Sequence, residues 1–142
     1  MLTQLSLFLE NRPGALSEAC NVLKRAGVNL RALALADTQQ FGILRLLVDN
    51  PAAGKAALSA DGFVVKENKV LALGVPDCAG GLAELFTVID RLGLSVEYMY
   101  AFAGGRKDRA VIVFRFTDQE QAAAKLTAEN VAVITADMLA AE

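Results

Sequence analysis

The sequence contains no histidine, and this absence removes several kinds of chemistry at once. Without imidazole there is no His-based general acid or base, no Ser-His or Cys-His nucleophile pair, and no ligand set for most transition-metal sites. The GxGxxG, GxxxxGK[ST] and CxxC motifs are missing as well. We therefore expect a protein that is not an enzyme and that holds no metal and no cofactor.

Cysteine, basic charge and long apolar runs are also scarce. The two cysteines, Cys20 and Cys78, are too few for a disulfide framework. The net charge of −2 leaves no basic field for phosphate backbones, so we expect no nucleic-acid partner. The apolar start of the chain is short and lacks a basic leader, and no run approaches the roughly 18 apolar residues of a membrane span. We expect a cytoplasmic protein without membrane contact.

The chain instead has abundant apolar residues, 54% in all, and an internal repeat. Gly14 and Gly80 precede two helical patterns that lie 66 residues apart, and Gly27 and Gly93 follow them. The apolar positions of the two patterns coincide at the spacing i, i+3, i+4, i+7: Leu16, Ala19, Cys20 and Leu23, then Leu82, Leu85, Phe86 and Ile89. This stripe predicts two helices with one buried face each, and it predicts a core position for Cys20.

The segments around these helices repeat too. Alternating apolar residues predict a strand before each helix: Leu5, Leu7 and Leu9, then Leu71, Leu73 and Val75. After each helix we expect a strand, a turn, a strand, an alanine-rich helix and a short strand, in that order. In the first half these lie near 28–37, Gln39-Gln40, Ile43–Val48, 51–60 and Phe63–Val65. In the second half they lie near 94–103, Gly104–Lys107, Val111–Phe116, 118–128 and Val131–Ile134. Residues 135–142 predict one or two further helical turns. Each half therefore reads β-α-β-β-α-β, an α+β ferredoxin-like unit with helices on one face of an antiparallel sheet.

No linker separates the two halves. We therefore predict two domains, residues 1–67 and 68–142, that pack against each other. The strands Ile43–Val48 and Val111–Phe116 are apolar on nearly both faces. A sheet with helices on one face needs little apolar surface on the other unless something covers it. We expect a homodimer in which two chains pack sheet face on sheet face.

The segment LFLENRPGALSEACNVLKRAGVNL resembles the ACT domain, a small amino-acid-binding regulatory module with a strand, a polar Pro-Gly loop, a helix and a Gly-Val-Asn start of its second strand. The segment LGVPDCAGGLAELFTVIDRLGLSVEYMY resembles the same module with a weaker loop. The tandem is similar to the stand-alone double ACT proteins of bacteria. The resemblance implies two units side by side, with their antiparallel sheets joined into one eight-stranded sheet. It also implies a regulatory protein whose partner is a free amino acid or a similar metabolite.

The resemblance places ligands between the first β–α loop of one unit and the second strand of the other. The implied ligand-binding residues are Asn11, Arg12, Gly14, Ala15 and Leu16 in the first half and Asp77, Gly80, Gly81 and Leu82 in the second, with Asn29 and Ser95 as lesser candidates at the start of the second strands. Cys78-Ala79 stands where the first loop has Arg12-Pro13. The two sites are therefore not equivalent.

These residue types suit an amino acid. Free amides at a helix N-terminus can bind its carboxylate, and glycine permits a close approach. For the ammonium group, the Asp77 carboxylate is a better acceptor than the Asn11 amide. The alternative is purely structural: Asn11 and Asp77 would cap helices, Gly14 and Gly80 would make turns, and Arg12 would be a solvated surface residue like the scattered acidic residues.

Two other functions stay open. The chain could be a regulatory subunit that docks on an amino-acid biosynthetic enzyme, as the small subunit of acetolactate synthase does. The N-terminal half of that family is also ACT-like, but its characteristic second domain is not evident here. The third is an enzyme on the same fold, which the missing histidines and cofactor motifs argue against.

Overall fold

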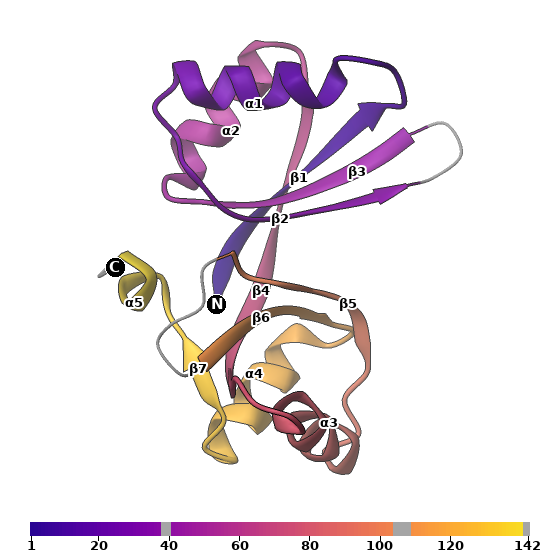
Figure 1. Cartoon of the computed structure of the whole chain (residues 1–142), viewed down its shortest axis with the longest axis vertical. Coiled ribbons are helices and arrows are strands. Elements are labelled where there is room, and N and C mark those ends of the chain that lie inside the picture. The colour runs from indigo at the N-terminus through magenta and orange to yellow at the C-terminus, as the bar shows by residue number, and fades with distance from the viewer. Residues whose placement is uncertain (38–40, 104–108, 141–142) are drawn as a thin grey trace. The chain divides into compact units, whose positions relative to one another are not determined.

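The structure is a computed structural model that describes residues 1–37, 41–103 and 109–140 (Figure 1). The chain divides into two compact units. The N-terminal unit comprises Thr3–Asn68, and the C-terminal unit comprises Lys69–Glu142 together with Met1–Leu2. The turns predicted around Gln39-Gln40 and Gly104–Lys107 lie outside the described residues.

The N-terminal unit has the predicted order of elements. They are β1 (Leu2–Glu10), α1 (Ala15–Arg25), β2 (Leu30–Asp37), β3 (Phe41–Val48), α2 (Pro51–Ala60) and the first part of β4 (Val64–Pro76). The strands lie in the order β2-β3-β1-β4, and β3 pairs antiparallel with both β1 and β2. Helices α1 and α2 cover one face of these strands (Figure 1). The predicted ferredoxin-like arrangement is therefore present.

The C-terminal unit repeats this arrangement. It contains the second part of β4, then α3 (Gly81–Arg91), β5 (Val96–Ala101), β6 (Arg109–Phe116), α4 (Gln119–Ala128), β7 (Ala132–Ile134) and α5 (Ala136–Ala140). Its strands lie in the order β5-β6-β4-β7 with antiparallel pairing. Helix α5 is the additional helical turn that the sequence predicted. Among the described residues, no helix is long and apolar enough to cross a membrane.

Strand β4 is continuous where the sequence indicated two strands and a polar connection. The residues Lys66-Glu67-Asn68-Lys69 lie inside it. Seven strands are therefore present over the described residues, and the expected eight-stranded sheet is not confirmed. A polar stretch breaks the apolar alternation that identifies a strand in a sequence, but backbone pairing does not require that alternation.

Each unit has its own core beneath its helices. The strand residues predicted to point inward are buried: Leu5, Leu7 and Leu9 in the N-terminal unit and Leu71, Leu73 and Val75 in the C-terminal unit. The buried side chains of the N-terminal core are aliphatic. In the C-terminal core Phe114 stacks on Phe116 with ring centroids 5.5 Å apart, and Phe86 meets Phe114 edge-on at 6.1 Å. The two units thus fill equivalent cores with different side chains.

The buried stripe of the first helix is shifted from the predicted one. The buried residues of α1 are Ala15, Ala19, Val22 and Leu23. Leu16 is 43% exposed and Cys20 is exposed, so the predicted core position of Cys20 was wrong. Leu82 of α3 is 37% exposed in the same way. The prediction began at the first large apolar residue, whereas the small residues Ala15 and Gly81 are the ones that face the sheet.

Candidate functional site

Each β–α loop ends on a left-handed glycine. Gly14 (φ 89°) precedes α1 and Gly80 (φ 88°) precedes α3, and no side chain caps either helix by a hydrogen bond. Helices α2 and α4 differ, because the side chains of Asn50 and Asp118 each accept a hydrogen bond from a first-turn amide. The glycines are needed because a side chain disfavours positive φ. Neither helix therefore has a cap side chain that accepts from its first-turn amides. The Ala15 and Gly81 amides donate to backbone carbonyl oxygens, at 3.3 and 3.1 Å, and the amides that follow them are where a helix N-terminus binds an external carboxylate.

Asn11 and Asp77 do not cap these helices, because Gly14 and Gly80 occupy the cap positions. Both side chains are exposed. The Asn11 Oδ1 atom lies over Gly42 of β3, about 3.5 Å from where a Cβ would stand. The capping interpretation of Asn11 and Asp77 is therefore wrong. Their proposed role in ligand binding is untouched by this result.

A cavity of about 310 Å³ lies in the N-terminal unit where β1 ends and α1 begins. Two of the predicted ligand-binding residues, Arg12 and Ala15, line it, whereas Asn11, Gly14 and Leu16 do not. The rest of its lining includes aromatic rings and carboxylates: Phe8, Phe41 and Phe63, with Glu10, Glu18 and Asp61. Sequence reasoning missed these side chains. Over the described ranges, no group of three or more His, Cys, Asp or Glu side chains is arranged to hold a metal ion.

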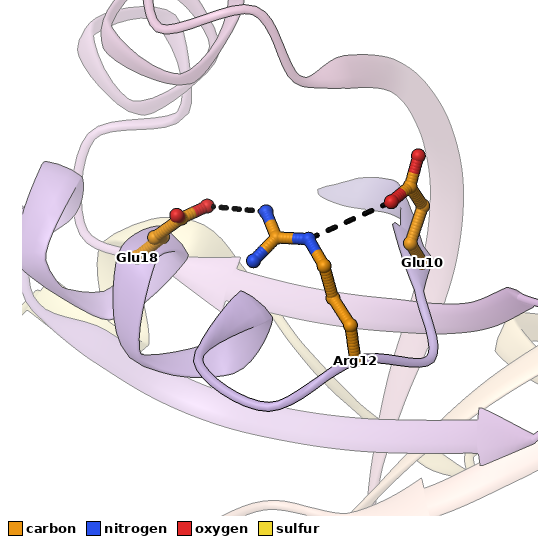
Figure 2. A network of polar contacts seen from close by, with 3 residues as sticks. All are labelled: Glu10, Arg12 and Glu18. Carbon is orange, nitrogen blue, oxygen red and sulfur yellow. Dashed lines mark hydrogen bonds and ion pairs between the residues drawn. The ribbon is translucent and has the colours of Figure 1, made fainter.

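Arg12 is held between two of these carboxylates (Figure 2). Its Nη2 atom donates to Glu18 Oε2 at 2.8 Å, and its Nε atom lies 3.5 Å from Glu10 Oε2. The hydrogen bond to Glu18, and then the charge of Glu18, raise the pKa of Arg12. The side chains of Arg12, Glu18 and Glu10 are 46%, 51% and 73% exposed, so solvent weakens this network. Its main effects are to position the guanidinium group and to neutralise its charge.

The loop between β4 and α3 is tighter than its counterpart. Both loops are closed by the same two backbone hydrogen bonds. The Arg12 and Cys78 amides donate to the Glu10 and Pro76 carbonyl oxygens, each at 2.9 Å, and the Ala15 and Gly81 amides donate to the Arg12 and Cys78 carbonyl oxygens at 3.3 and 3.1 Å. A Cβ at Gly81 would overlap the Pro76 oxygen, whereas Ala15 is accommodated at the equivalent position. Only glycine therefore fits at position 81, for a packing reason that needs no ligand.

Asn29 and Ser95 have equivalent backbone roles. The Asn29 carbonyl accepts from the Asp49 amide, and the Ser95 carbonyl accepts from the Thr117 amide, both at 3.0 Å. The Asn29 amide also donates to Asp49 Oδ1 at 3.0 Å. Both side chains are exposed, and neither residue lines the cavity of the N-terminal unit. The structure does not bring Asn29 together with Arg12 and Ala15.

Two β–α loops with left-handed glycines, on two units of the same topology, define a duplicated β-α-β-β-α-β module. A family model described as an ACT domain pair matches residues 1–141. The chain therefore belongs to the ACT domain pair family. ACT domains are regulatory modules.

Solved structures show the same fold. Protein BT0572 from Bacteroides thetaiotaomicron is 34% identical, with 97% of this chain and 94% of that chain covered and a TM-score of 0.90. The regulatory subunit of aspartate kinase from Thermus thermophilus, in its ligand-free form, is 15% identical over 89% of this chain and 88% of its own, with a TM-score of 0.65. The corresponding subunit from Thermus flavus is 13% identical over 88% and 90%, with a TM-score of 0.56. No curated protein matches the sequence.

Proposed function

We propose that this chain is a regulatory protein that binds a free amino acid or a similar metabolite at the β–α loop of its N-terminal unit, and that it catalyses nothing itself. The observation that carries the proposal is the cavity at that loop, which brings together Arg12, the start of α1 at Ala15 and a set of aromatic rings. Membership of a regulatory family supports it.

The cavity offers a partner for each part of an amino acid. The cap residue of α1, Gly14, has no side chain to accept from the first-turn amides, and a helix N-terminus favours the ligand carboxylate. Glu10 provides a carboxylate for the α-ammonium group. The rings of Phe8, Phe41 and Phe63 provide apolar contact for the side chain.

The second loop is proposed as a weaker site, formed by Asp77, Gly80, Gly81 and Leu82. We also keep the side-by-side arrangement and the homodimer as proposals. Within its own unit β2 pairs with β3, and β5 pairs with β6, so each is an edge strand there. Edge strands are available for pairing with a further strand, which an eight-stranded sheet would use.

Isothermal titration against the twenty amino acids tests the proposal. At least one should release or take up heat, and Arg12→Ala should change its affinity more than Asp77→Asn if the first loop is the main site. The melting temperatures of the free variants should stay close to the wild-type value, because both residues are exposed. A larger effect of Asp77→Asn would move the main site to the second loop.

A second candidate function is docking on a biosynthetic enzyme. Leu33 and Leu35 on the edge strand β2 are each 53% exposed, which favours a protein partner. The aspartate kinase subunits of similar fold are named as regulatory subunits of an enzyme. Absence of heat from every amino acid, together with a co-purified enzyme, would favour this function over the first.

A further inference from the structure

Acidic side chains outnumber basic ones in the lining of the N-terminal cavity. The carboxylates of Glu10, Glu18 and Asp61 line it, and Arg12 is its basic lining residue. When all are ionised, the lining residues have two carboxylates in excess. Lys66, whose ammonium lies 5.5 Å from the centroid of the Phe8 ring, and Arg25, which lines a neighbouring pocket with Asp61, offset part of this excess. Charges beside apolar walls act more strongly on a ligand than charges on an open surface, because the walls focus the field. The lining therefore favours a positively charged ligand group.

Arg12 is already engaged by the protein (Figure 2). Its hydrogen bond to Glu18 is 2.8 Å long, and Glu10 lies on the other side at 3.5 Å. An acidic ligand side chain that binds Arg12 must compete with Glu18 for it. Two carboxylates already lie beside this guanidinium group, so a third meets repulsion.

The end of α2 acts in the same direction. Asp61 is the C-terminal cap of this helix and lines the cavity with Gly62. A helix C-terminus carries partial negative charge and stabilises a cation nearby. Asp61 adds a full carboxylate charge at that end.

Resting on the proposed function, we propose that this cavity selects amino acids with a cationic side chain over neutral and acidic ones of the same length, and that Glu18 sets this selectivity by holding Arg12. The methylene groups of such a ligand lie against Phe41 and Phe63, and its charged end meets Asp61 at the end of α2.

The C-terminal unit does not repeat this charge pattern. At the positions that correspond to Glu10 and Arg12 it has Pro76 and Cys78. The carboxylate–guanidinium network of Figure 2 therefore has no equivalent in the second loop. We expect one cationic ligand per chain.

Three amino acids of similar length separate the effect of charge from the effect of size. Lysine ends in an ammonium group, norleucine in a methyl group and 2-aminoadipate in a carboxylate. In isothermal titrations lysine should bind tightest and 2-aminoadipate weakest, with steps of about threefold to tenfold, because the lining carboxylates are solvent-exposed. Raising the salt concentration should reduce the differences between the three affinities, because salt screens the charges. Norleucine binding as tightly as lysine would overturn the selectivity.

Glu18→Gln tests the role given to the ion pair. Releasing Arg12 should lower the affinity for lysine and raise the affinity for 2-aminoadipate, each by about threefold to tenfold. The matched control is Glu84→Gln, which removes the corresponding carboxylate from α3 and should leave all three affinities unchanged. An unchanged ranking in Glu18→Gln, with wild-type melting temperature, would overturn the role of Glu18. Silence of all twenty amino acids is a different outcome, which overturns the proposed function.

Discussion

At the end of its first strand the N-terminal unit has Glu10 and Arg12 beside a cavity, where the C-terminal unit has Pro76 and Cys78 in a loop whose Pro76 carbonyl oxygen leaves no room for a side chain at Gly81. Both loops nevertheless end on glycines with nearly the same φ, 89° at Gly14 and 88° at its counterpart. The left-handed glycine at the helix start is thus common to both units, while the side chains around it differ. The comparison indicates one scaffold used twice, with charged side chains beside a cavity at one loop and not at the other.

The C-terminal ends of α2 and α4 differ as well. Glu129 is the counterpart of Asp61 and caps the end of α4 as Asp61 caps the end of α2. Arg91 binds Glu129 through two hydrogen bonds, of 2.8 and 3.1 Å. In the N-terminal unit Asp61 lines the cavity instead. The same position thus supports an ion pair in one unit and a candidate ligand site in the other.

The largest effect should come from the cores. Phe114→Ala removes a fully buried ring that contacts two other rings and should lower the free energy of unfolding by about 3–5 kcal/mol. Its counterpart Leu46→Ala should cost about 2–5 kcal/mol. Urea denaturation measures both. A cost below about 1 kcal/mol for Phe114→Ala would contradict the aromatic core of the C-terminal unit.

The loops should give the next effect. Gly81→Ala forces a Cβ against the Pro76 carbonyl and should cost about 1–3 kcal/mol in the free energy of unfolding. The opposite change, Ala15→Gly, should cost at most about 1 kcal/mol, because only helix propensity and a small buried methyl are lost. Denaturation in urea again gives both values. Equal losses of unfolding free energy for Gly81→Ala and Ala15→Gly would contradict the tighter packing of the second loop.

The element order could be predicted because the repeat offers two copies of each signal. Leu5 and Leu71 alternate with their neighbours in the same way, and Gly27 and Gly93 both have φ 69° as their predicted helix-end positions require. The cavity could not be predicted. Glu10, Phe41 and Asp61 are far apart in the sequence, and only the pairing of β1 with β3 and the turn into β4 bring them together. An available signal was that the Arg12-Pro13 of the first loop is replaced by Cys78-Ala79 in the second.

The capped helices should behave alike in both units. Asn50→Ala and Asp118→Ala each remove a side-chain acceptor of a first-turn amide and should each cost about 0.5–2 kcal/mol in the free energy of unfolding. The two values, measured by thermal or urea unfolding, should agree within about 0.5 kcal/mol. A clear inequality would show that the units differ beyond their loops and cores.

The smallest effect should come from the ion pair of the C-terminal unit. The hydrogen bond from Arg91, and then its charge, lower the pKa of Glu129 below its ordinary value of 4.5. The folded state therefore favours ionised Glu129, and this stabilisation is complete above pH 4.5 and disappears as the pH falls through the lowered pKa. Wild type should melt slightly above Glu129→Gln at neutral pH, and the gap should close in acid. If the difference in melting temperature between wild type and Glu129→Gln did not depend on pH, it would come from packing and not from the ion pair.

The central claim is that the first β–α loop binds an amino acid, and amide chemical shifts report on it directly. In ¹H–¹⁵N spectra of the full chain titrated with lysine, the amides of residues 12–18 and 61–64 should shift together along one saturation curve. The corresponding amides of residues 78–84 and 129–132 should stay in place. Shifts confined to residues 78–84, or to neither set while heat of binding is seen, would contradict the claim.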